Sequence, residues 1–326
     1  MRVLFLTIPF YEYIEKIKDS IRKNYNCEVD VMFTSMNYKN LKGIESLKYY
    51  YAQKNSKEFY DDIEKKRQHQ EFSLLKRHKY DYIFVLVGKG LKIDEYKLFL
   101  TTQPNAKKIL YLWDDVARVQ EFQHYRSLFD IIYSFDKMDC NKYGLNFLPL
   151  FYTQEYEYDN EIKRYDFSFT GWLHSERERF VEDIYKENSQ RKWCVWLRTT
   201  RLHVIYEFLL TFGKKRPSKF YKYKDLSMAE SALLMKNSRI VIDMPYAHQN
   251  GLSIRTIESL AAQCKLITTN KEVKSYDFYN DNNILIVERH NPVIPETFIN
   301  KEYIDVPSYI KERYSLNNWI KVIFES

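Results

Sequence analysis

The residue types best suited to binding chemistry are concentrated between His248 and Ala262. A polar loop containing Asn250, Gly251, Leu252 and Ser253 leads there into a helical pattern. Backbone N–H groups at the start of a helix favour anions, and Arg255 can offer a guanidinium fork to a phosphate. Glu258 can accept hydrogen bonds from sugar hydroxyls. The stretch therefore predicts a site for a phosphorylated ligand, with a nucleotide sugar as the first choice.

Each of these residues also has a purely structural interpretation. Arg255 and Glu258 are three positions apart, a spacing at which two exposed side chains can form a weak surface ion pair. His248 can be a loop histidine without a role, or it can contact the phosphate or sugar of a ligand. The residue types leave both interpretations open.

Two carboxylates follow an apolar run in the first half of the chain. Asp114 and Asp115 come directly after residues 108–113, where they can cap the next helix. The carboxyl ends of parallel strands are also where α/β proteins bind their ligands. Lys89, His174 and Tyr11 are weaker candidates for a site.

The elements that must position these residues alternate along the chain. Short apolar runs predict strands over 2–7, 28–33, 82–87, 108–113, 131–135 and 146–150, and helical patterns over 11–23, 56–76, 95–100, 116–128 and 137–143. A second series predicts strands over 166–170, 193–197, 239–243, 265–268 and 284–287, and helices over 175–187, 202–212, 227–236, 254–263 and near 274–279. Such alternation is typical of a parallel sheet with helices on both faces, so the fold class is α/β with two Rossmann-like domains.

The predicted domain limits follow from this pattern. Residues 1–152 form a first Rossmann-like domain, the polar, tyrosine-rich segment 153–164 forms a linker, and residues 165–305 form a second Rossmann-like domain. Residues 306–326 form a helix that returns to the first domain. No Gly-x-Gly-x-x-Gly follows the first strand and no Walker-type loop occurs, which argues against a nicotinamide dehydrogenase, a kinase or a P-loop ATPase.

Composition narrows the class further. Four scattered cysteines show neither a Cys-x-x-Cys pair nor zinc-ligand spacing, so we expect reduced thiols, no metal site and no cofactor. The chain has no run of about 18 apolar residues, and we expect a cytoplasmic protein, with an association at the inner face of the membrane left open. Residues 1–150 hold 25 Lys and Arg against 20 Asp and Glu, out of a total net charge of +7.

Much of this excess lies around residues 54–79, where six basic side chains cluster: Lys65, Lys66, Arg67, Lys76, Arg77 and Lys79. The cluster is typical of a solvated helix face, and it can also attract an anionic membrane or an acidic acceptor. We expect no nucleic acid as a partner, because no recognised binding motif accompanies the charge.

Several motifs resemble those of GT-B glycosyltransferases, specifically the glycosyl transferases group 1 and the CgeB-like enzymes of bacterial surface-polysaccharide assembly. They are the segments Phe167-Ser-Phe-Thr-Gly-Trp172, Ser238-Arg-Ile-Val-Ile-Asp243, the stretch 251–262 and Lys265-Leu-Ile-Thr-Thr-Asn270. In the first half, segments 111–114, 133–136, 143–145 and 147–150 look like parts of capsule or lipopolysaccharide glycosyltransferases. Gly251 stands where many group 1 enzymes carry a further acidic residue.

The resemblance implies two domains facing across a cleft, with the donor nucleotide in the second domain and the acceptor in the first. Glu258 would bind ribose hydroxyls, Arg255 would pair with the diphosphate, and backbone N–H groups of residues 250–253 would assist. Gly171 would allow close approach of the backbone to a phosphate or sugar. Asp114 or Asp115 would be the base of an inverting reaction, whereas a retaining reaction needs none.

The sequence thus predicts a metal-independent hexosyl- or related transferase that uses a nucleoside diphosphate sugar, with uridine diphosphate (UDP) as the first choice. The acceptor would be a surface polysaccharide or a lipid-linked glycan, with membrane contact through the basic first domain. The alternative is a non-catalytic GT-B-like binding partner in a polysaccharide assembly complex.

Overall fold

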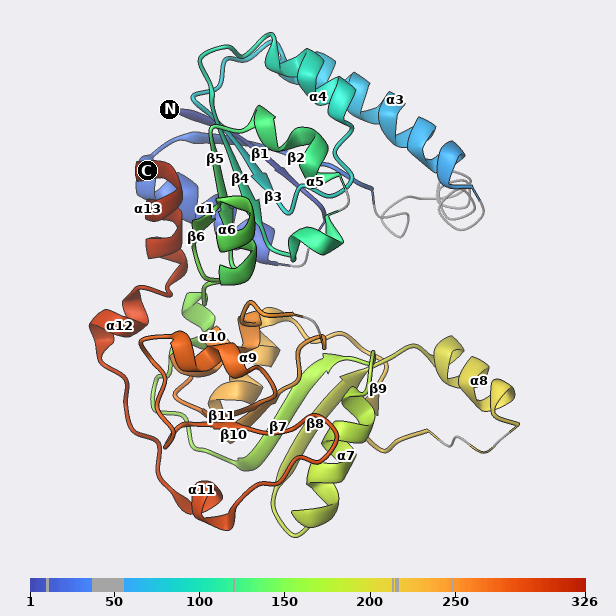
Figure 1. Ribbon diagram of the computed structural model, residues 1–326, viewed down its shortest axis with the longest axis vertical. Helices are drawn as coiled ribbons and strands as arrows, with labels where there is room; N and C mark the ends of the chain where they lie inside the picture. Colours follow the sequence, from blue (N-terminus) through green and yellow to red (C-terminus); the bar gives the residue numbers. More distant parts are fainter. Residues whose placement is uncertain (10–11, 37–55, 120, 213, 215–216, 248) are drawn as a thin grey trace. The chain divides into compact units, whose positions relative to one another are not determined.

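The computed structural model describes residues 1–9, 12–36, 56–119, 121–212, 214, 217–247 and 249–326. These residues form two compact units, one of Met1–Pro149 together with Ile320–Ser326, and one of Leu150–Trp319 (Figure 1). Each unit is built around one six-stranded sheet in which every pairing is parallel. The predicted α/β class with two Rossmann-like sheets is confirmed.

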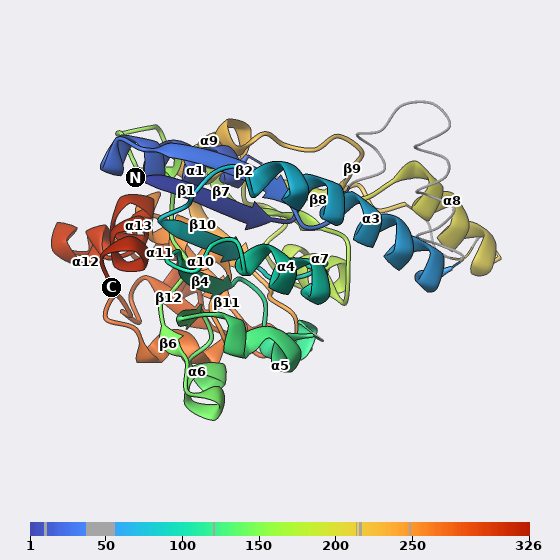
Figure 2. The same cartoon turned by 90° about the horizontal axis from the view of Figure 1, so that it is seen from above.

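The first sheet has the order β2-β1-β3-β4-β5-β6. Its strands are β1 (Arg2–Thr7), β2 (Glu28–Phe33), β3 (Tyr82–Leu86), β4 (Lys107–Leu112), β5 (Ile131–Ser134) and β6 (Asn146–Phe147). The helices of this unit are α1 (Tyr13–Tyr25), α3 (Lys57–Leu75), α4 (Ile93–Leu100), α5 (Phe122–Tyr125) and α6 (Lys137–Tyr143), with 3-10 turns η2 (Val116–Arg118) and η3 (Arg126–Leu128). The helices α3 and α4 lie side by side in both views (Figure 2).

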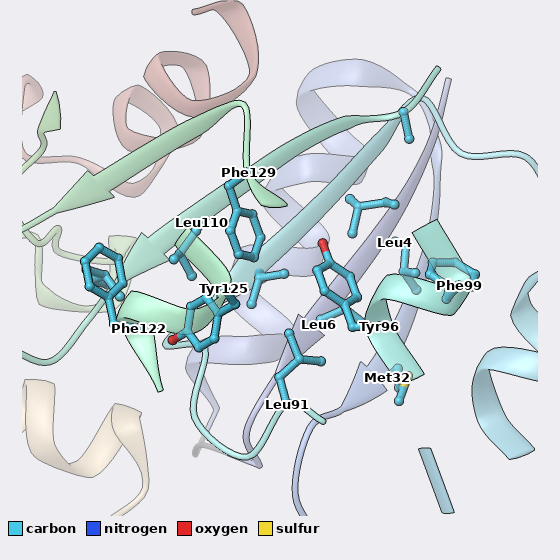
Figure 3. Packing of buried hydrophobic residues seen from close by; sticks show 14 of the residues in the cluster. Leu4, Leu6, Met32, Leu91, Tyr96, Phe99, Leu110, Phe122, Tyr125 and Phe129 are labelled. Carbon is cyan, nitrogen blue, oxygen red and sulfur yellow. The ribbon is translucent and has the colours of Figure 1, made fainter. Parts of the chain in front are cut away.

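Alternate residues of the central strands build a core on each face of this sheet. Leu4 and Leu6 of β1 pack with Tyr96 and Phe99 of α4 on one face (Figure 3). Phe84 of β3 belongs to the other face, where the ring of Phe324 lies 5.8 Å from it, centroid to centroid. Both faces of the sheet are therefore buried, as the apolar runs predict.

The second sheet has the order β12-β11-β10-β7-β8-β9. Its strands are β7 (Tyr165–Trp172), β8 (Trp193–Arg198), β9 (Tyr221–Lys222), β10 (Ser238–Asp243), β11 (Lys265–Thr268) and β12 (Ile284–Ile286). Its helices are α7 (Arg177–Glu187), α8 (Arg201–Leu210), α9 (Met228–Lys236), α10 (Ile254–Ala261), α11 (Glu296–Asn300) and α12 (Ser308–Glu312), with 3-10 turns η4 (Gln154–Tyr156) and η5 (Lys271–Ser275). The last helix, α13 (Leu316–Glu325), begins in this unit and ends in the first. The sequence pattern missed only the short β9 among the strands described.

Two predicted helices differ from the structure. Residues 116–128 form η2, α5 and η3 in place of one helix, because the buried side chains of Val116, Val119, Phe122 and Tyr125 recur every third position. A repeat of three is that of a 3-10 helix and does not fit the 3.6 residues of an α-turn. Near 274–279, the 3-10 turn η5 stands in place of the expected helix.

The linker and the tail also depart from a simple pattern. Residues 153–164 lie within the second unit, where Tyr156 is buried and the N–H of Tyr158 donates to the Ala261 carbonyl. The tail forms two helices, α12 and α13, separated where Tyr152 bonds to the backbone of residues 314 and 316. The first part of α13 belongs to the second unit, and Ile320–Ser326 belongs to the first.

Candidate functional site

The second sheet places a topological switch point between β7 and β10. Its chain begins at β7, adds β8 and β9 on one side, and then adds β10, β11 and β12 on the other. Open α/β sheets bind ligands outside the carboxyl ends of the strands at such a point. Gly171 lies near the end of β7, Asp243 ends β10, and Arg255 lies in the first turn of α10.

Asp243 ties the start of α10 to the end of β10. Its carboxylate is fully buried and accepts hydrogen bonds from Ser253 Oγ at 2.7 Å, Arg255 Nη1 at 2.7 Å and Thr256 Oγ1 at 3.2 Å. Ser253 is also the N-cap of α10, where it accepts from the Thr256 N–H. A buried carboxylate needs such partners, so Asp243 fixes the position of the Arg255 guanidinium.

A second guanidinium lies beside that of Arg255. Arg177, in the first turn of α7, is buried, and it donates from Nε to the Met244 carbonyl at 3.0 Å and from Nη1 to the Trp172 carbonyl at 3.1 Å. Burial and, after it, the positive charge of Arg255 lower the pKa of Arg177 to about 10, while the charge of Asp243 opposes the shift. The two positive charges therefore repel each other where water is partly excluded, and a bound anion would offset this repulsion.

Gly171 provides the space in which these groups meet. A Cβ at this position would lie 3.0 Å from Arg177 Nη1 and 3.3 Å from Arg255 Nη2. The ring of Phe169 lies under both guanidinium groups, at 5.9 Å from Arg177 Cζ and 5.5 Å from Arg255 Cζ. The glycine predicted for close approach therefore lies at the centre of the arginine pair.

Arg289 adds a third positive charge. Its Nη2 donates to the Pro245 carbonyl at 2.8 Å, and its charge contributes to the lowered pKa of Arg177. Next to this group, His174 stacks on Tyr246 with ring centroids 4.2 Å apart and an interplanar angle of 10°. We call Arg177, Arg255 and Arg289 the arginine cluster; Asp243 is the carboxylate in contact with it.

The predicted loop is held by Asn270, which follows β11 and is the N-cap of η5. Asn270 Nδ2 donates to the carbonyls of Asn250 at 3.0 Å and Gly251 at 3.2 Å. Leu252 is buried, which anchors the loop to the core. His248 lies outside the described residues, as does Tyr11.

Glu258 lies one turn along α10 from Arg255. Its side chain is largely buried, with 4 % exposed, and the side chain of Arg255 is 14 % exposed. These residues therefore do not form an exposed surface pair. The ion pair that fixes Arg255 runs to Asp243, a residue that the sequence pattern did not single out.

In the first unit, Asp114 and Asp115 follow β4 as predicted. Asp114 forms an ion pair with Lys89, which follows β3. Asp115 Oδ2 lies 3.4 Å from Arg118 Nε, and burial raises the pKa of Asp115, with Asp136 and Asp114 adding to the effect and Arg118 opposing it. A carboxylate of raised pKa is a stronger base, so Asp115 is the better suited of the two to accept a proton.

The loop after β3 has unusual backbone geometry. Val87, Gly88 and Gly90 all have positive φ, of 74°, 75° and 76°. A β-branched residue in this region is strained, and such strain is found preferentially at functional sites. The strained loop presents Lys89 to Asp114. Lys89, a weaker site candidate, therefore lies beside Asp114, one of the two stronger candidates of the first unit.

Three of the six basic residues named around 54–79 lie on α3, and all three face carboxylates. Arg67 pairs with Glu64 and Glu71, Lys66 with Asp62, and Lys65 with Asp94. Much of the positive charge on this helix is therefore compensated locally.

Two observations concern metals and membranes. Among the residues described, no group of three or more His, Cys, Asp and Glu side chains is arranged to hold a metal ion. None of the helices in the described part of the chain combines the length and hydropathy needed to cross a bilayer.

Sequence reasoning missed Arg177, Arg289 and Asp243. Two of them carried a signal: Asp243 is the one acid closing an otherwise apolar strand core, and Arg177 opens the helix that follows β7. Both positions are at strand-to-helix junctions, where α/β sites form. Arg289 follows the last strand in a loop, and no local pattern distinguishes it.

No family model and no curated protein matches this sequence. Solved structures do match its fold. HepE from Anabaena, in complex with UDP and glucose, aligns with a TM-score of 0.62 and 10% identity over 100% of this chain and 98% of its own. AviGT4, a glycosyltransferase involved in avilamycin A biosynthesis, gives 0.58 and 10% over 100% and 96%.

A UDP-GlcNAc 2-epimerase from Neisseria meningitidis, bound to UDP-GlcNAc, gives a TM-score of 0.58 and 11% identity over 100% of this chain and 99% of its own. The chain therefore has the GT-B fold that glycosyltransferases and UDP-sugar epimerases share. The finer resemblance to group 1 and CgeB-like enzymes stays a prediction.

Proposed function

We propose that this protein is a glycosyltransferase that moves a sugar from a UDP-sugar to a surface-polysaccharide or lipid-linked glycan acceptor. The observation that carries the proposal is the arginine cluster around Gly171 at the switch point of the second sheet. Asp243 pairs with Arg255, whereas Arg177 and Arg289 donate to backbone carbonyls, so positive charge exceeds negative charge among these four described side chains. A diphosphate has the complementary charge, and guanidinium forks match its oxygens.

The likeness to enzymes solved with UDP and UDP-glucose supports the same ligand class. In sugar transfer, the bond between the sugar and the diphosphate breaks and negative charge develops on the leaving UDP. Arg177 and Arg255 are fixed before the ligand arrives, so they stabilise that charge without reorganising. The reaction then needs no metal to neutralise the leaving group.

Other residues have roles that follow from their positions. Glu258 would accept hydrogen bonds from the ribose, and backbone N–H groups of the loop 250–253, held by Asn270, would contact the phosphates. In an inverting reaction the acceptor hydroxyl attacks the sugar while Asp115 takes its proton, and the raised pKa of Asp115 suits it for that role.

A ligand-stability screen tests the site directly. We expect UDP to raise the melting temperature of the full chain more than uridine, which lacks the diphosphate, because binding to the folded state stabilises it. The double variant Arg177→Gln/Arg255→Gln should lose this shift. The matched control Arg179→Gln changes an exposed arginine of α7 that pairs with Asp183, and it should keep the shift. Equal shifts in both variants would contradict the assignment of the site.

Product analysis separates the enzyme classes. We expect UDP release from a UDP-sugar in the presence of a glycan acceptor, and we expect it to persist in a chelator. The shared fold makes UDP-sugar epimerisation a second candidate, which would give an isomerised nucleotide sugar without release of UDP. Binding of UDP without any turnover would instead indicate a non-catalytic partner in an assembly complex.

A further inference from the structure

The helix α8 of the second unit exposes its apolar side chains, whereas a helix of a globular domain ordinarily buries them. It begins with Thr200 as N-cap, which accepts from the His203 N–H, but none of its residues is buried. Between Leu202 and Phe212, seven large apolar side chains are exposed by 44 % to 93 %: Leu202, Ile205, Tyr206, Phe208, Leu209, Leu210 and Phe212. Isolated exposed apolar residues are ordinary, whereas contiguous patches mark interaction surfaces.

The spacing of these residues gives the patch one direction. Leu202, Ile205, Tyr206 and Leu209 follow the i, i+3, i+4, i+7 pattern, which puts them on one stripe of the helix. The half-buried residues Val204, Glu207 and Thr211 lie on the opposite side. The apolar stripe therefore faces away from its own domain, and Figure 1 shows α8 standing apart from the sheet of the second unit.

The end of α8 extends this surface. Phe212 has φ 51°, in the left-handed region that bulky residues rarely adopt. Its side chain is 93 % exposed. An aromatic ring is thus held in water at the end of a stripe of leucines, and it contributes apolar surface that its own domain does not cover.

The charge of the residues that follow the stripe indicates which kind of surface the stripe contacts. From Thr211 to Lys224 the sequence holds six Lys and Arg and no Asp or Glu, and of these Lys224 pairs with Glu230 of α9. Lys214 and Lys219 are exposed, and Arg201 begins the helix. An apolar helix face bordered by basic residues is the pattern of a helix that lies in the interface of a bilayer with anionic lipids.

We propose that α8, with Lys214 and Lys219 beyond its end, docks this protein on an anionic lipid surface, with the apolar stripe among the acyl chains and these two lysines at the headgroups. This surface is separate from the basic helix α3, whose cations largely face carboxylates. It is also separate from the arginine cluster, so the proposal does not depend on the nucleotide ligand.

The test is sedimentation of the full chain, without nucleotide, with vesicles of phosphatidylcholine alone or mixed with phosphatidylglycerol. We expect binding to the mixed vesicles, and we expect Leu202→Gln/Leu209→Gln to lower the partition coefficient by at least about tenfold. The control Leu74→Gln/Leu98→Gln changes two leucines of α3 and α4 that are 58 % and 59 % exposed, and it should bind like the unaltered chain. Melting temperatures show that all variants fold.

A second pair of variants tests the charge. Lys214→Gln/Lys219→Gln should weaken binding to phosphatidylglycerol vesicles by about fivefold per lysine and leave binding to phosphatidylcholine unchanged. Equal binding by the α8 variant and the control would overturn the proposal. So would a protein that binds no vesicles but sediments as a dimer whose association is lost in the α8 variant, because the stripe would then cover a second copy of the chain.

Discussion

The carboxyl ends of the two sheets have the same construction and opposite charge. In the second unit, the arginine cluster meets one contacting carboxylate, Asp243. In the first unit, Asp114, Asp115, Asp136 and Asp139 gather after β4 and β5, with Lys89, Arg118 and Lys142 among their cationic neighbours. Two parallel sheets thus gather guanidinium groups at the carboxyl ends of their strands in one case and carboxylates in the other.

The comparison shows that the topology supplies the position of a site and the side chains supply its chemistry. A diphosphate would be repelled by the carboxylates of the first unit and attracted by the second. A hydroxyl that must lose its proton instead needs a nearby carboxylate that accepts it. Variants that change either the arginine cluster or the carboxylates of the first unit, one group at a time, are the most direct way to assign the two roles.

The largest effect is expected from removing positive charge in the second unit. The change Arg177→Ala/Arg255→Ala should weaken UDP binding by about 10³-fold, because a hydrogen bond to a charged group contributes about 1.5–3 kcal/mol. Isothermal titration calorimetry measures this loss. Arg179→Ala, on the same helix, is the control, and a loss of less than about tenfold in the double variant would place the diphosphate elsewhere.

The next effect concerns the first unit. Asp115→Asn should lower turnover by about 10²-fold or more and leave UDP affinity unchanged, since a general base contributes about 10²–10⁴. Steady-state kinetics with saturating donor gives the value. Asp130→Asn, at the amino end of β5, should have no such effect. Unaltered turnover in Asp115→Asn would rule out the proton-transfer role.

A pH titration sharpens the contrast through Arg177. Its pKa of about 10 belongs to the unliganded protein, and a diphosphate binds the charged form. The affinity for UDP should therefore be highest below pH 10 and fall as the pH rises above that value, by up to about tenfold per pH unit. Fluorescence titration of UDP follows the change, and Arg177→Gln should show no such step. A flat profile in the unaltered chain would mean that Arg177 does not meet the ligand.

The smallest effect is expected at Gly171. Gly171→Ala places a Cβ 3.0 Å from Arg177 Nη1, and the crowding should lower UDP affinity by about fivefold, or ~1 kcal/mol. Gly144→Ala is a useful contrast, because its φ of 67° makes any side chain strained while a Cβ there meets nothing. It should lower the melting temperature and leave UDP affinity intact. The reverse pattern would contradict the close-approach role of Gly171.

Much of this architecture could be predicted from the sequence. Strands such as β1 and β11 have the predicted bounds, because the buried strands of a parallel sheet are largely apolar runs bounded by polar residues. The loop before α10 and the position of Arg255 could also be predicted, since a polar, glycine-containing turn before a helix is a local pattern.

The remaining parts depend on strand order, which is not local. Arg177 and Arg255 are 78 positions apart, and they meet only because β7 and β10 are neighbours in the sheet. The direction of α8 is a similar case: its apolar spacing predicts a helix, but the same spacing ordinarily predicts burial. The structure exposes that face instead.

The last turn of α13 has a consequence for how the chain is made. Phe324 covers Tyr82 and Phe84 of β3, at 5.1 Å and 5.8 Å between ring centroids. It is synthesised after the whole of Leu150–Trp319. Phe84 and Phe324 are 240 positions apart, so at ribosomal rates of about 5–20 residues per second β3 waits about 10–50 seconds for its cover. During that interval Tyr82 and Phe84 lack the ring that later packs on them, so a chaperone that binds aromatic segments of nascent chains would bind at these two residues.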